Sequence, residues 1–442
     1  MRCMGLTKDD RTLRKTSPAP RPPHDAVRGA GSGQRRAWLV LALILAALNL
    51  RPAISSLGPV LAEVRADLGM NGTVAGLLTS LPALCFGLFG FAAPRLARRF
   101  GPAAVVIAGL VALTVGLALR SLMPTTVPFL LTTTVALAGI AVGNVLMPVL
   151  VKRWFPDRIG TMTGVYAGVA ALGAAVSAAM TVPLTGALGD SWRLGIGVWA
   201  VVTALALLPW LAARPSFRRA ELRKGGAGGG EGEGEGRGAG GTGSAAAPPV
   251  PSLARSRTAW ALAVFFGLQA TAAYITLGWA SQIFRDAGVG AGTAGLLLAL
   301  VMGLGGPLGF VVPRVAARMR HQGPLVAVLG ACGLVGYAGL WLAPASGAWV
   351  WAVFLGVANC AFPVALTMIG LRARSATGVA RLSAFAQSVG YLICIPGPLV
   401  IGSLYEATGG WDVPLAVMAG LMAVQIAVGV VAGRDRRVED GD

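Results

Sequence analysis

Apolar stretches of membrane-spanning length recur along almost the whole chain and constrain the fold most. A helix needs about 20 apolar residues to cross the hydrocarbon core of a bilayer. Lipid offers no partner to backbone N–H and C=O groups, so each stretch must satisfy its own by forming a helix. We therefore predict an all-α membrane protein with twelve transmembrane helices, at residues 37–60, 72–93, 102–122, 127–150, 160–184, 194–213, 258–282, 291–312, 324–343, 347–370, 382–403 and 412–433.

The charged residues fix an orientation for these helices. The chain is 55% hydrophobic and 12% charged, and its net charge of +19 could suggest nucleic acid as a partner. If the N-terminus is cytoplasmic, however, all but five of the 37 Lys and Arg fall in cytoplasmic segments, as the positive-inside rule requires. We predict a multi-pass protein of the cell (cytoplasmic) membrane with both termini cytoplasmic, embedded in the lipid bilayer and binding no nucleic acid. The five exceptions are Arg51, Arg65, Arg120, Arg193 and Arg285.

The two halves of the chain repeat each other. Three short motifs occur twice, in the same order and at nearly the same offset. Each half has six spans that start on the same side, so we predict two six-helix bundles related by a pseudo-twofold axis along the membrane normal. The paired motifs are Ala75-Gly76-Leu77-Leu78 with Ala294-Gly295-Leu296-Leu297, Gly90 to Arg99 with Gly309 to Arg318, and Asn144 to Pro148 with Asn359 to Pro363.

A Gly-rich segment separates the halves. It contains alternating Glu and Gly, lacks the apolar residues of a core, and is predicted to be a flexible cytoplasmic linker. The expected organisation is a disordered cytoplasmic tail at 1–36, an N-terminal bundle at 37–213, the linker at 214–257, a C-terminal bundle at 258–433 and a cytoplasmic tail at 434–442.

Arg51 is a charge deep inside the first span. At about 1.5 Å per residue it lies roughly 20 Å from the start of that span, near the midplane. A charge there costs about 2.5–3.5 kcal/mol, and of the 18 acidic residues only Asp412, at the very end of the last span, falls within a predicted span, so none lies deep enough to offset it. We predict that Arg51 faces a cavity and contacts the substrate. The alternative is an arginine held by backbone carbonyls and hydroxyls for packing, or one that snorkels to an interface.

Pro52 gives the first span a bend next to this charge. A proline has no N–H, so the carbonyl of Leu48 loses its helical partner and must find another. Arg51 and Ser55 are four residues apart and share a face, which we assign to the cavity. Asn49 lies on a different face and is expected to bond a neighbouring helix.

The run from Gly90 to Arg99 resembles the loop between spans two and three of the major facilitator superfamily. Pro94 replaces the acidic residue of that pattern and Ala97 its second glycine, while Gly90, Ala93, Arg95, Arg98 and Arg99 match. The resemblance implies two bundles that work by alternating access. We predict that the two repeat-related loops, with Arg95, Arg98, Arg99, Arg314 and Arg318, form a cytoplasmic hinge region that gates transport and does not touch substrate.

Two further motifs resemble the cyanate transporter and 2-nitroimidazole exporter (CynX/NimT) branch. They are Asn49-Leu50-Arg51-Pro52 with Gly58-Pro59, and Phe266-Gly267-Leu268-Gln269 with Tyr274 and Trp279. Spans one, four, seven and ten line the central cavity in the superfamily, which implies substrate-binding roles for Asn144, Gln269, Tyr274 and Asn359. Gln387 and Tyr391, which share a face of the eleventh span, are further candidates. For each polar residue the alternative is hydrogen bonding between helices.

The planar guanidinium of Arg51 suits a carboxylate-like anion, which would serve as its counter-ion. We predict a secondary active transporter, acting as a monomer without cofactor or metal. Its substrate would be a small anionic or acceptor-rich solute: a cyanate-like anion, a small carboxylate or a flat heterocycle. A multidrug-type exporter of neutral or lipophilic compounds is an alternative. A polytopic membrane enzyme is a distant one, because the only histidines, His24 and His321, lie outside the spans.

Overall fold

The computed structural model describes residues 24–155, 158–227 and 253–438 and is built almost entirely of helices. Within these residues, 12 helical segments are long and apolar enough to cross a membrane. Each coincides with a predicted span, so the predicted twelve-span all-α fold is confirmed. The segments are Ala37–Leu68, Gly72–Gly90, Pro102–Leu122, Thr126–Trp154, Thr161–Ala187, Trp192–Ala212, Arg257–Asp286, Ala291–Arg318, Gly323–Leu342, Ala348–Leu371, Gly378–Thr408 and Asp412–Ala432.

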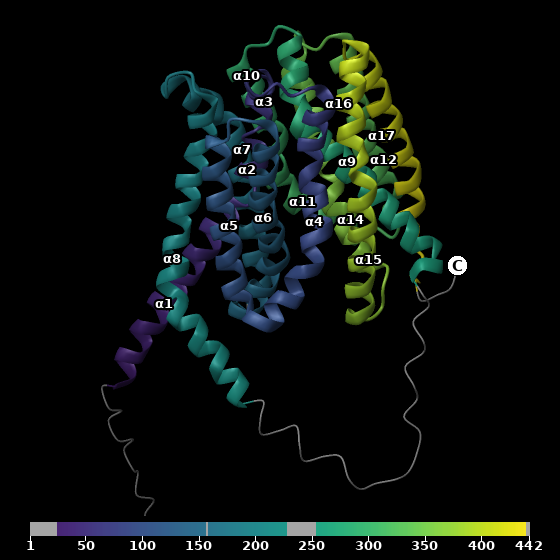
Figure 1. The fold of residues 1–442 in the computed structure, drawn as a ribbon. Coiled ribbons are helices and arrows are strands. Elements are labelled where there is room, and N and C mark those ends of the chain that lie inside the picture. The colour runs from purple at the N-terminus through teal and green to yellow at the C-terminus, as the bar shows by residue number, and fades with distance from the viewer. Residues whose placement is uncertain (1–23, 156–157, 228–252, 439–442) are drawn as a thin grey trace, which may run out of the picture.

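The spans form two bundles that stand side by side, the first purple to teal and the second green to yellow in Figure 1. The first contains α1(His24–Asn49), α2(Pro52–Ser55), η1(Gly58–Val60), α3(Leu61–Leu68), α4(Gly72–Phe100), α5(Pro102–Leu122), α6(Thr126–Trp154), α7(Ile159–Ala187) and α8(Trp192–Ala227). The second contains η3(Leu253–Arg255), α9(Arg257–Asp286), α10(Ala291–Gly303), α11(Gly305–Arg318), α12(Gly323–Leu342), α13(Ala348–Asn359), α14(Ala361–Leu371), α15(Ala376–Cys394), α16(Pro396–Thr408) and α17(Asp412–Ala432).

Four spans are interrupted. The first breaks between α1 and α2, directly before Pro52, where the missing N–H of proline predicts it. The eighth, tenth and eleventh break between α10 and α11, α13 and α14, and α15 and α16. Backbone groups freed at such breaks need partners inside the protein, so the breaks mark places where neighbouring helices must supply polar groups.

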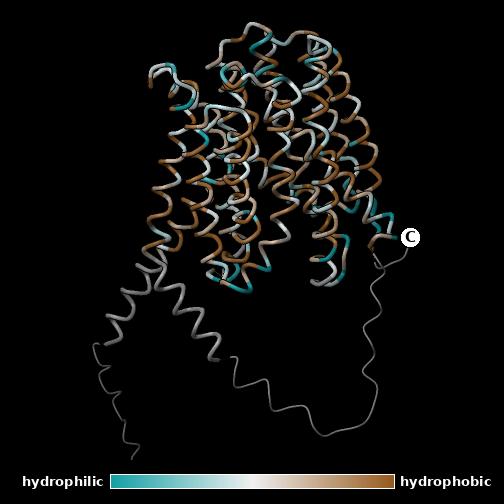
Figure 2. Tube along the Cα trace, in the orientation of Figure 1, coloured by the Kyte–Doolittle hydropathy of each residue, from teal (hydrophilic) through white to brown (hydrophobic). Residues whose placement is uncertain are grey.

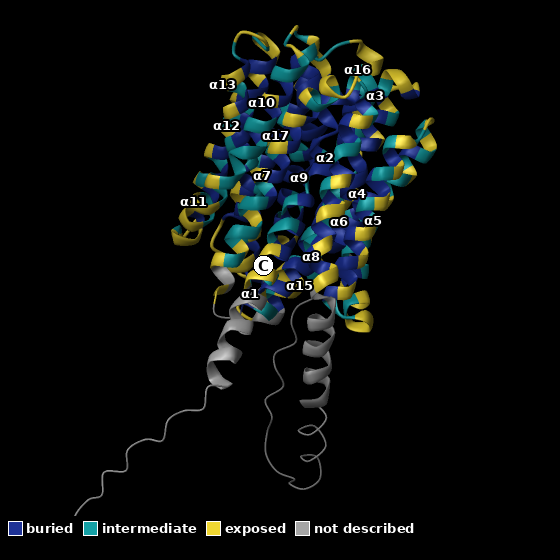
Figure 3. Ribbon diagram, turned by 90° about the vertical axis from the view of Figure 1, so that its left-hand side faces the viewer, coloured by how far each residue is buried: buried dark blue, intermediate teal, exposed yellow. Residues whose placement is uncertain are grey.

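The helices are brown along most of their length and teal at their ends and connecting loops (Figure 2). Large apolar side chains on the outside of the bundles are exposed, as expected of residues that face lipid tails; Leu131, Val201 and Leu208 are examples. The seventh span, α9, is the most deeply buried, with 78% of its most apolar window inside the protein (Figure 3).

Two helices extend past the predicted domain limits. Helix α8 continues to Ala227, so the first residues of the predicted linker are helical, and α1 already begins at His24 inside the predicted tail. Residues 218–224 consist of Arg, Ala, Glu, Leu and Lys, which are strong helix formers and extend the last turn of the span. The rest of the linker, residues 228–252, and the chain ends at 1–23 and 439–442 lie outside the described residues.

Candidate functional site

Arg51 lies in the turn between α1 and α2, at the break of the first span. Its carbonyl accepts hydrogen bonds from the N–H groups of Ile54 and Ser55, at 3.0 and 3.1 Å, and from the Ser55 hydroxyl at 3.0 Å. Its side chain is half-buried, whereas Asn49 and Leu50 beside it are buried. The backbone at this position is therefore held firmly while the guanidinium remains accessible.

The charge of Arg51 has no acidic partner: within residues 24–155, 158–227 and 253–438 it makes no ion pair. The groups on which this charge acts electrostatically include the phenols of Tyr166, Tyr274 and Tyr391. Tyr166 belongs to α7 of the first bundle, and the other two belong to α9 and α15 of the second. Three of the five tyrosines of the chain, contributed by both bundles, therefore lie within the electrostatic reach of one guanidinium.

Aromatic rings continue this cluster. The Tyr166 hydroxyl donates to Oδ1 of Asn144 at 3.0 Å. The ring centre of Phe86 lies 6.4 Å from that of Tyr274 and 5.6 Å from that of Tyr391, and the rings of Phe266 and Tyr391 are nearly perpendicular with their centres 5.2 Å apart. Sequence reasoning found Tyr274, Tyr391 and Asn144 but missed Tyr166 and the two phenylalanines. The scarcity of tyrosine in so apolar a chain was the available signal.

Other candidates from the sequence point into the bundles. The Ser55 hydroxyl, 1% exposed, lies 2.6 Å from that of Ser177 on α7, inside the first bundle. Asn49 Oδ1 accepts from Thr203 Oγ1 on α8 at 2.9 Å. Gln387 Nε2 donates to Ser383 Oγ on its own helix at 2.7 Å. Ser55 and Asn49 thus join helices of the first bundle, whereas the bond of Gln387 stays within α15.

Gln269 is likewise turned into the second bundle. It is 1% exposed, accepts at Oε1 from Gln425 Nε2 at 2.7 Å, and donates from Nε2 to the backbone carbonyl of Asn359 at 3.4 Å. Asn359 is the last residue of α13, next to the break of the tenth span. Both bonds join helices of the second bundle, which is the role expected of Gln269 if it does not bind substrate.

The carbonyl of Leu48, which Pro52 leaves without a helical partner, lies against the backbone of Gly173 on α7. A Cβ atom at Gly173 would sit against the Leu48 oxygen, closer than real Cβ contacts allow. We expect Gly173→Ala to force the helices apart and to lower the free energy of unfolding by about 1–3 kcal/mol. Melting temperature checks this. Gly420→Ala is the control, because a Cβ there meets nothing within 4 Å; equal melting temperatures in the two variants would contradict the expectation.

The two bundles are bonded to each other at the ends that the sequence predicts to lie outside. Arg285 donates from Nη2 and Nη1 to the two carboxylate oxygens of Glu63, at 2.7 and 2.8 Å, and from Nη1 to the Pro59 carbonyl at 3.1 Å. Glu406 Oε2 accepts from the N–H groups of Gly72, at 2.7 Å, and Thr73, at 3.3 Å, the first two residues of α4. A carboxylate is favourable at a helix N-terminus. We call Glu63, Arg285 and Glu406 the outer lock.

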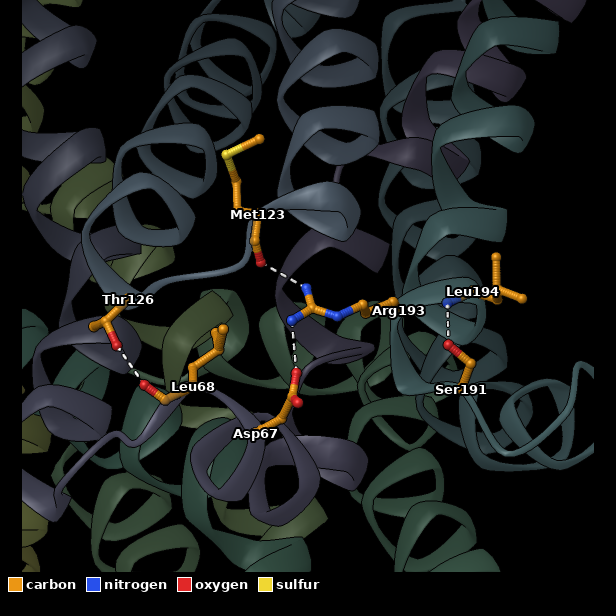
Figure 4. A network of polar contacts seen from close by, with 7 residues as sticks. All are labelled: Asp67, Leu68, Met123, Thr126, Ser191, Arg193 and Leu194. Carbon is orange, nitrogen blue, oxygen red and sulfur yellow. Dashed lines mark hydrogen bonds and ion pairs between the residues drawn. The ribbon is translucent and has the colours of Figure 1, made fainter.

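Arg65 and three aromatic rings form a second cluster at the same end of the bundles. The guanidinium of Arg65 lies 5.8 Å from the ring of Trp279 and 5.6 Å from that of Tyr405. Tyr405 stacks on Trp411 at 4.4 Å, and both donate to Asp286 Oδ2 at 2.8 Å. The helix α3 that carries Glu63 and Arg65 is in turn fastened to its own bundle by hydrogen bonds among the outer loops, including an Asp67–Arg193 ion pair of 2.6 Å (Figure 4).

Glycines bring the two backbones together below the outer lock. A Cβ at Gly58 would come 2.6 Å from the Leu277 carbonyl oxygen, and one at Gly76 would come 2.7 Å from that of Pro398. The cavity left here, lined by Ile54, Thr79 and Gly278 among others, measures ≈ 20 Å³, room for about one water molecule. The bundles are thus closed on each other at this end, which the sequence predicts to face outside, while their ribbons diverge toward the opposite end (Figure 1).

The predicted cytoplasmic gating residues lie at the inner ends of α4 and α11, where all five are exposed: Arg95, Arg98, Arg99, Arg314 and Arg318. Arg314 donates to the Phe310 carbonyl of its own helix at 2.9 Å. Sequence reasoning missed Arg372, which is buried just beyond the tenth span. It donates to Gln322 Oε1 and to the Gly433 carbonyl and so joins three inner ends of the second bundle. Burial lowers the pKa of its guanidinium.

Comparison with known proteins gives consistent matches. Residues 37–395 match the model of the Major Facilitator Superfamily. The chain is 33% identical to the 2-nitroimidazole transporter of Escherichia coli (strain K12), over 92% of this chain and 98% of that protein, and 26% identical to the cyanate transport protein CynX of the same organism, over 88% and 96%. A crystal structure of the nucleoside transporter NupG superposes with a TM-score of 0.69 at 13% identity, covering 90% of this chain and 98% of that one.

Proposed function

This chain belongs to the Major Facilitator Superfamily, in the branch that its motifs resemble, and from that premise we propose that it carries a small anionic or acceptor-rich solute across the cytoplasmic membrane by alternating access. Membership makes it a multi-pass membrane transporter with a small-molecule substrate. To this we add the class of solute, the residues that bind it and the topology. We propose cytoplasmic termini, because nearly all basic residues then lie on the cytoplasmic side.

The observation that carries this proposal is the unpaired charge of Arg51 among three tyrosines. A guanidinium presents five N–H donors and the phenols of Tyr274 and Tyr391 present one O–H donor each, whereas the Tyr166 O–H is bonded to Asn144, so the cluster offers donors and no negative group. A bound anion would supply the missing charge. Because Arg51 comes from one bundle and Tyr274 and Tyr391 from the other, an anion held between them would favour the closed arrangement of the bundles around it.

The aromatic rings restrict the shape of the solute. The rings of Phe86 and Tyr391, 5.6 Å apart and only half-buried, leave aromatic surface beside this cluster, which suits a planar or linear solute whose acceptor atoms lie at one edge. The two relatives are named for 2-nitroimidazole, a planar ring with nitro oxygens, and for cyanate, a linear anion. Both solutes fit this description, which supports carrying the class over to this chain.

A thermal-shift screen with ligands of one shape and three charges tests the proposal. Benzoate, benzamide and benzamidinium share a ring and a planar head group but carry negative, zero and positive charge. We expect benzoate, and cyanate or 2-nitroimidazole beside it, to raise the melting temperature of the purified protein in a saturable way. Benzamide should act weakly and benzamidinium not at all. Stabilisation by benzamidinium but not by benzoate would overturn the proposal.

The alternative of a multidrug-type exporter rests on the same aromatic faces, which suit neutral lipophilic compounds as well. The two functions differ in what Arg51 does. An exporter of neutral compounds should give equal shifts with benzamide and benzoate, and those shifts should survive loss of the guanidinium.

A further inference from the structure

Arg120 is a second arginine inside the membrane, and it is completely buried. It belongs to α5, is 0% exposed, and donates from Nη1 to the Ala53 carbonyl at 2.8 Å. Its Nε and Nη2 atoms are buried and have no hydrogen-bond partner among the described residues. Its nearest aromatic neighbour is Phe129, with the guanidinium 6.0 Å from the ring centre. Most of the donors of this costly group are therefore unused.

The bond to Ala53 holds the short helix α2. In a regular helix the Ala53 carbonyl would accept from the N–H of Leu57, but that N–H turns to Ile54 instead, at 3.3 Å. Arg120 takes the free carbonyl, as cations do at helix C-termini. Ala53 lies in the short segment that links Arg51, in the candidate substrate site, to Glu63 in the outer lock. Arg120 is therefore hydrogen-bonded to the segment that connects the candidate substrate site to the outer lock.

Stability alone does not explain this arginine. A buried ion that is only partly hydrogen-bonded can often be replaced by an apolar residue of similar size without loss of stability. Ser56 adds a second unused group: its hydroxyl oxygen is 0% exposed and has no hydrogen-bond partner among the described residues. Ser56 follows Ala53 by three residues, so both project from the same side of the segment. An unused acceptor thus lies one turn beyond the carbonyl that Arg120 already holds.

We infer that Arg120 is a positioning residue that holds the α2 segment in two arrangements. With the outer lock closed it donates to the Ala53 carbonyl, as observed. When the outer lock opens, α2 shifts past it, and the guanidinium gains the Ser56 hydroxyl through the donors that are free in the closed state. Arg120 thereby stabilises the outward-open state and couples movement at Arg51 to the outer lock. This movement of the protein does not depend on which solute is carried.

Ser56→Ala is the sharpest test, because in the closed state Ser56 bonds nothing that its removal could break. The reporter is Thr79→Cys, 8% exposed in the closed cavity below the outer lock, in a chain whose five native cysteines are replaced. A membrane-impermeant maleimide added outside reacts with it only while the outer side is open. We expect Ser56→Ala to slow this labelling about tenfold, the loss of one charge-assisted hydrogen bond, with an unchanged or higher melting temperature.

Two further variants make the result specific. Ser80→Ala removes a hydroxyl that is also buried but bonds its own helix, at the Gly76 carbonyl, and should label like the parent. In an Arg120→Met background, Ser56→Ala should have no further effect, because its partner is gone. Unchanged labelling in Ser56→Ala overturns the inference, and so does an effect that persists in full with Arg120→Met. If Arg120→Met does not fold, Arg120→Lys takes its place and should reduce the effect of Ser56→Ala.

Discussion

Arg51→Ala is expected to lower the affinity for benzoate or another substrate anion at least tenfold while leaving the protein folded. The guanidinium is half-buried and makes no ion pair among the described residues, so little in the protein itself depends on it. The anion, in contrast, loses its main counter-charge, and a hydrogen bond to a charged group contributes about 1.5–3 kcal/mol. Arg51→Lys keeps the charge without the planar pair of donors, so its affinity for the anion should lie between those of the parent protein and Arg51→Ala.

Melting temperature and anion affinity are measured on the same preparations. Arg98→Ala is the control, since it removes an exposed arginine at the inner end of α4, away from the tyrosine cluster. If Arg51 only braces the break between α1 and α2, Arg51→Ala will melt at a lower temperature and bind the anion normally. Normal affinity in Arg51→Ala would remove the central support for an anionic substrate.

Sequence predicted the fold because the bilayer permits few solutions. An apolar stretch of about 20 residues must form a helix there, and the uneven distribution of Lys and Arg between the loops predicts which way each span crosses the membrane. The break before Pro52 was predictable for an equally local reason, the missing N–H. The helical extensions of α1 and α8 were not, because outside the apolar region helix propensity competes with Gly-rich composition over only a few residues.

The candidate site was only partly predictable, because long-range packing decides where a polar side chain points. Arg51 stood out through the cost of its charge. Gln269 looked equally polar, but its partner Gln425 lies 156 residues away and turns it into the second bundle. Tyr166 was missed because its rarity in the chain does not say where it points, and only the packing of α7 brings it within the electrostatic reach of Arg51.

The outer lock could not be predicted from the sequence for a related reason. Glu63 and Arg285 lie at the ends of their spans, where charges are common and carry little information about partners. Only the packing of α3 against α9 brings the two side chains together across the bundles. The burial of Arg120 was hidden for the same reason: an arginine near the end of a span is common, yet the structure buries this one completely.

Reversing the charge of Arg285 is expected to open the outer side. Arg285→Glu sets two carboxylates and the Pro59 carbonyl against one another where a two-point ion pair stood. The pair itself, with side chains 21% and 37% exposed, is partly screened by solvent, so its loss alone should have a modest effect. Repulsion adds to that loss. We expect labelling of Thr79→Cys by an external impermeant maleimide to rise at least tenfold, and net transport to fall because the closed state is rarely reached.

The double variant Glu63→Arg with Arg285→Glu decides whether the pair acts as a gate. Exchanging the partners restores opposite charges, so labelling should return most of the way to the parent value, which neither single variant can reach. If the two residues instead affected opening independently of each other, the effects of the two substitutions would add, and the double variant would label faster than either single variant. The bond of Glu406 to the N-terminus of α4 remains in all of these variants and explains why recovery need not be complete for the interpretation to hold. If the double variant labels as fast as Arg285→Glu alone, the ion pair does not control opening, and the closed outer side must depend on the glycine contacts at Gly58 and Gly76 instead.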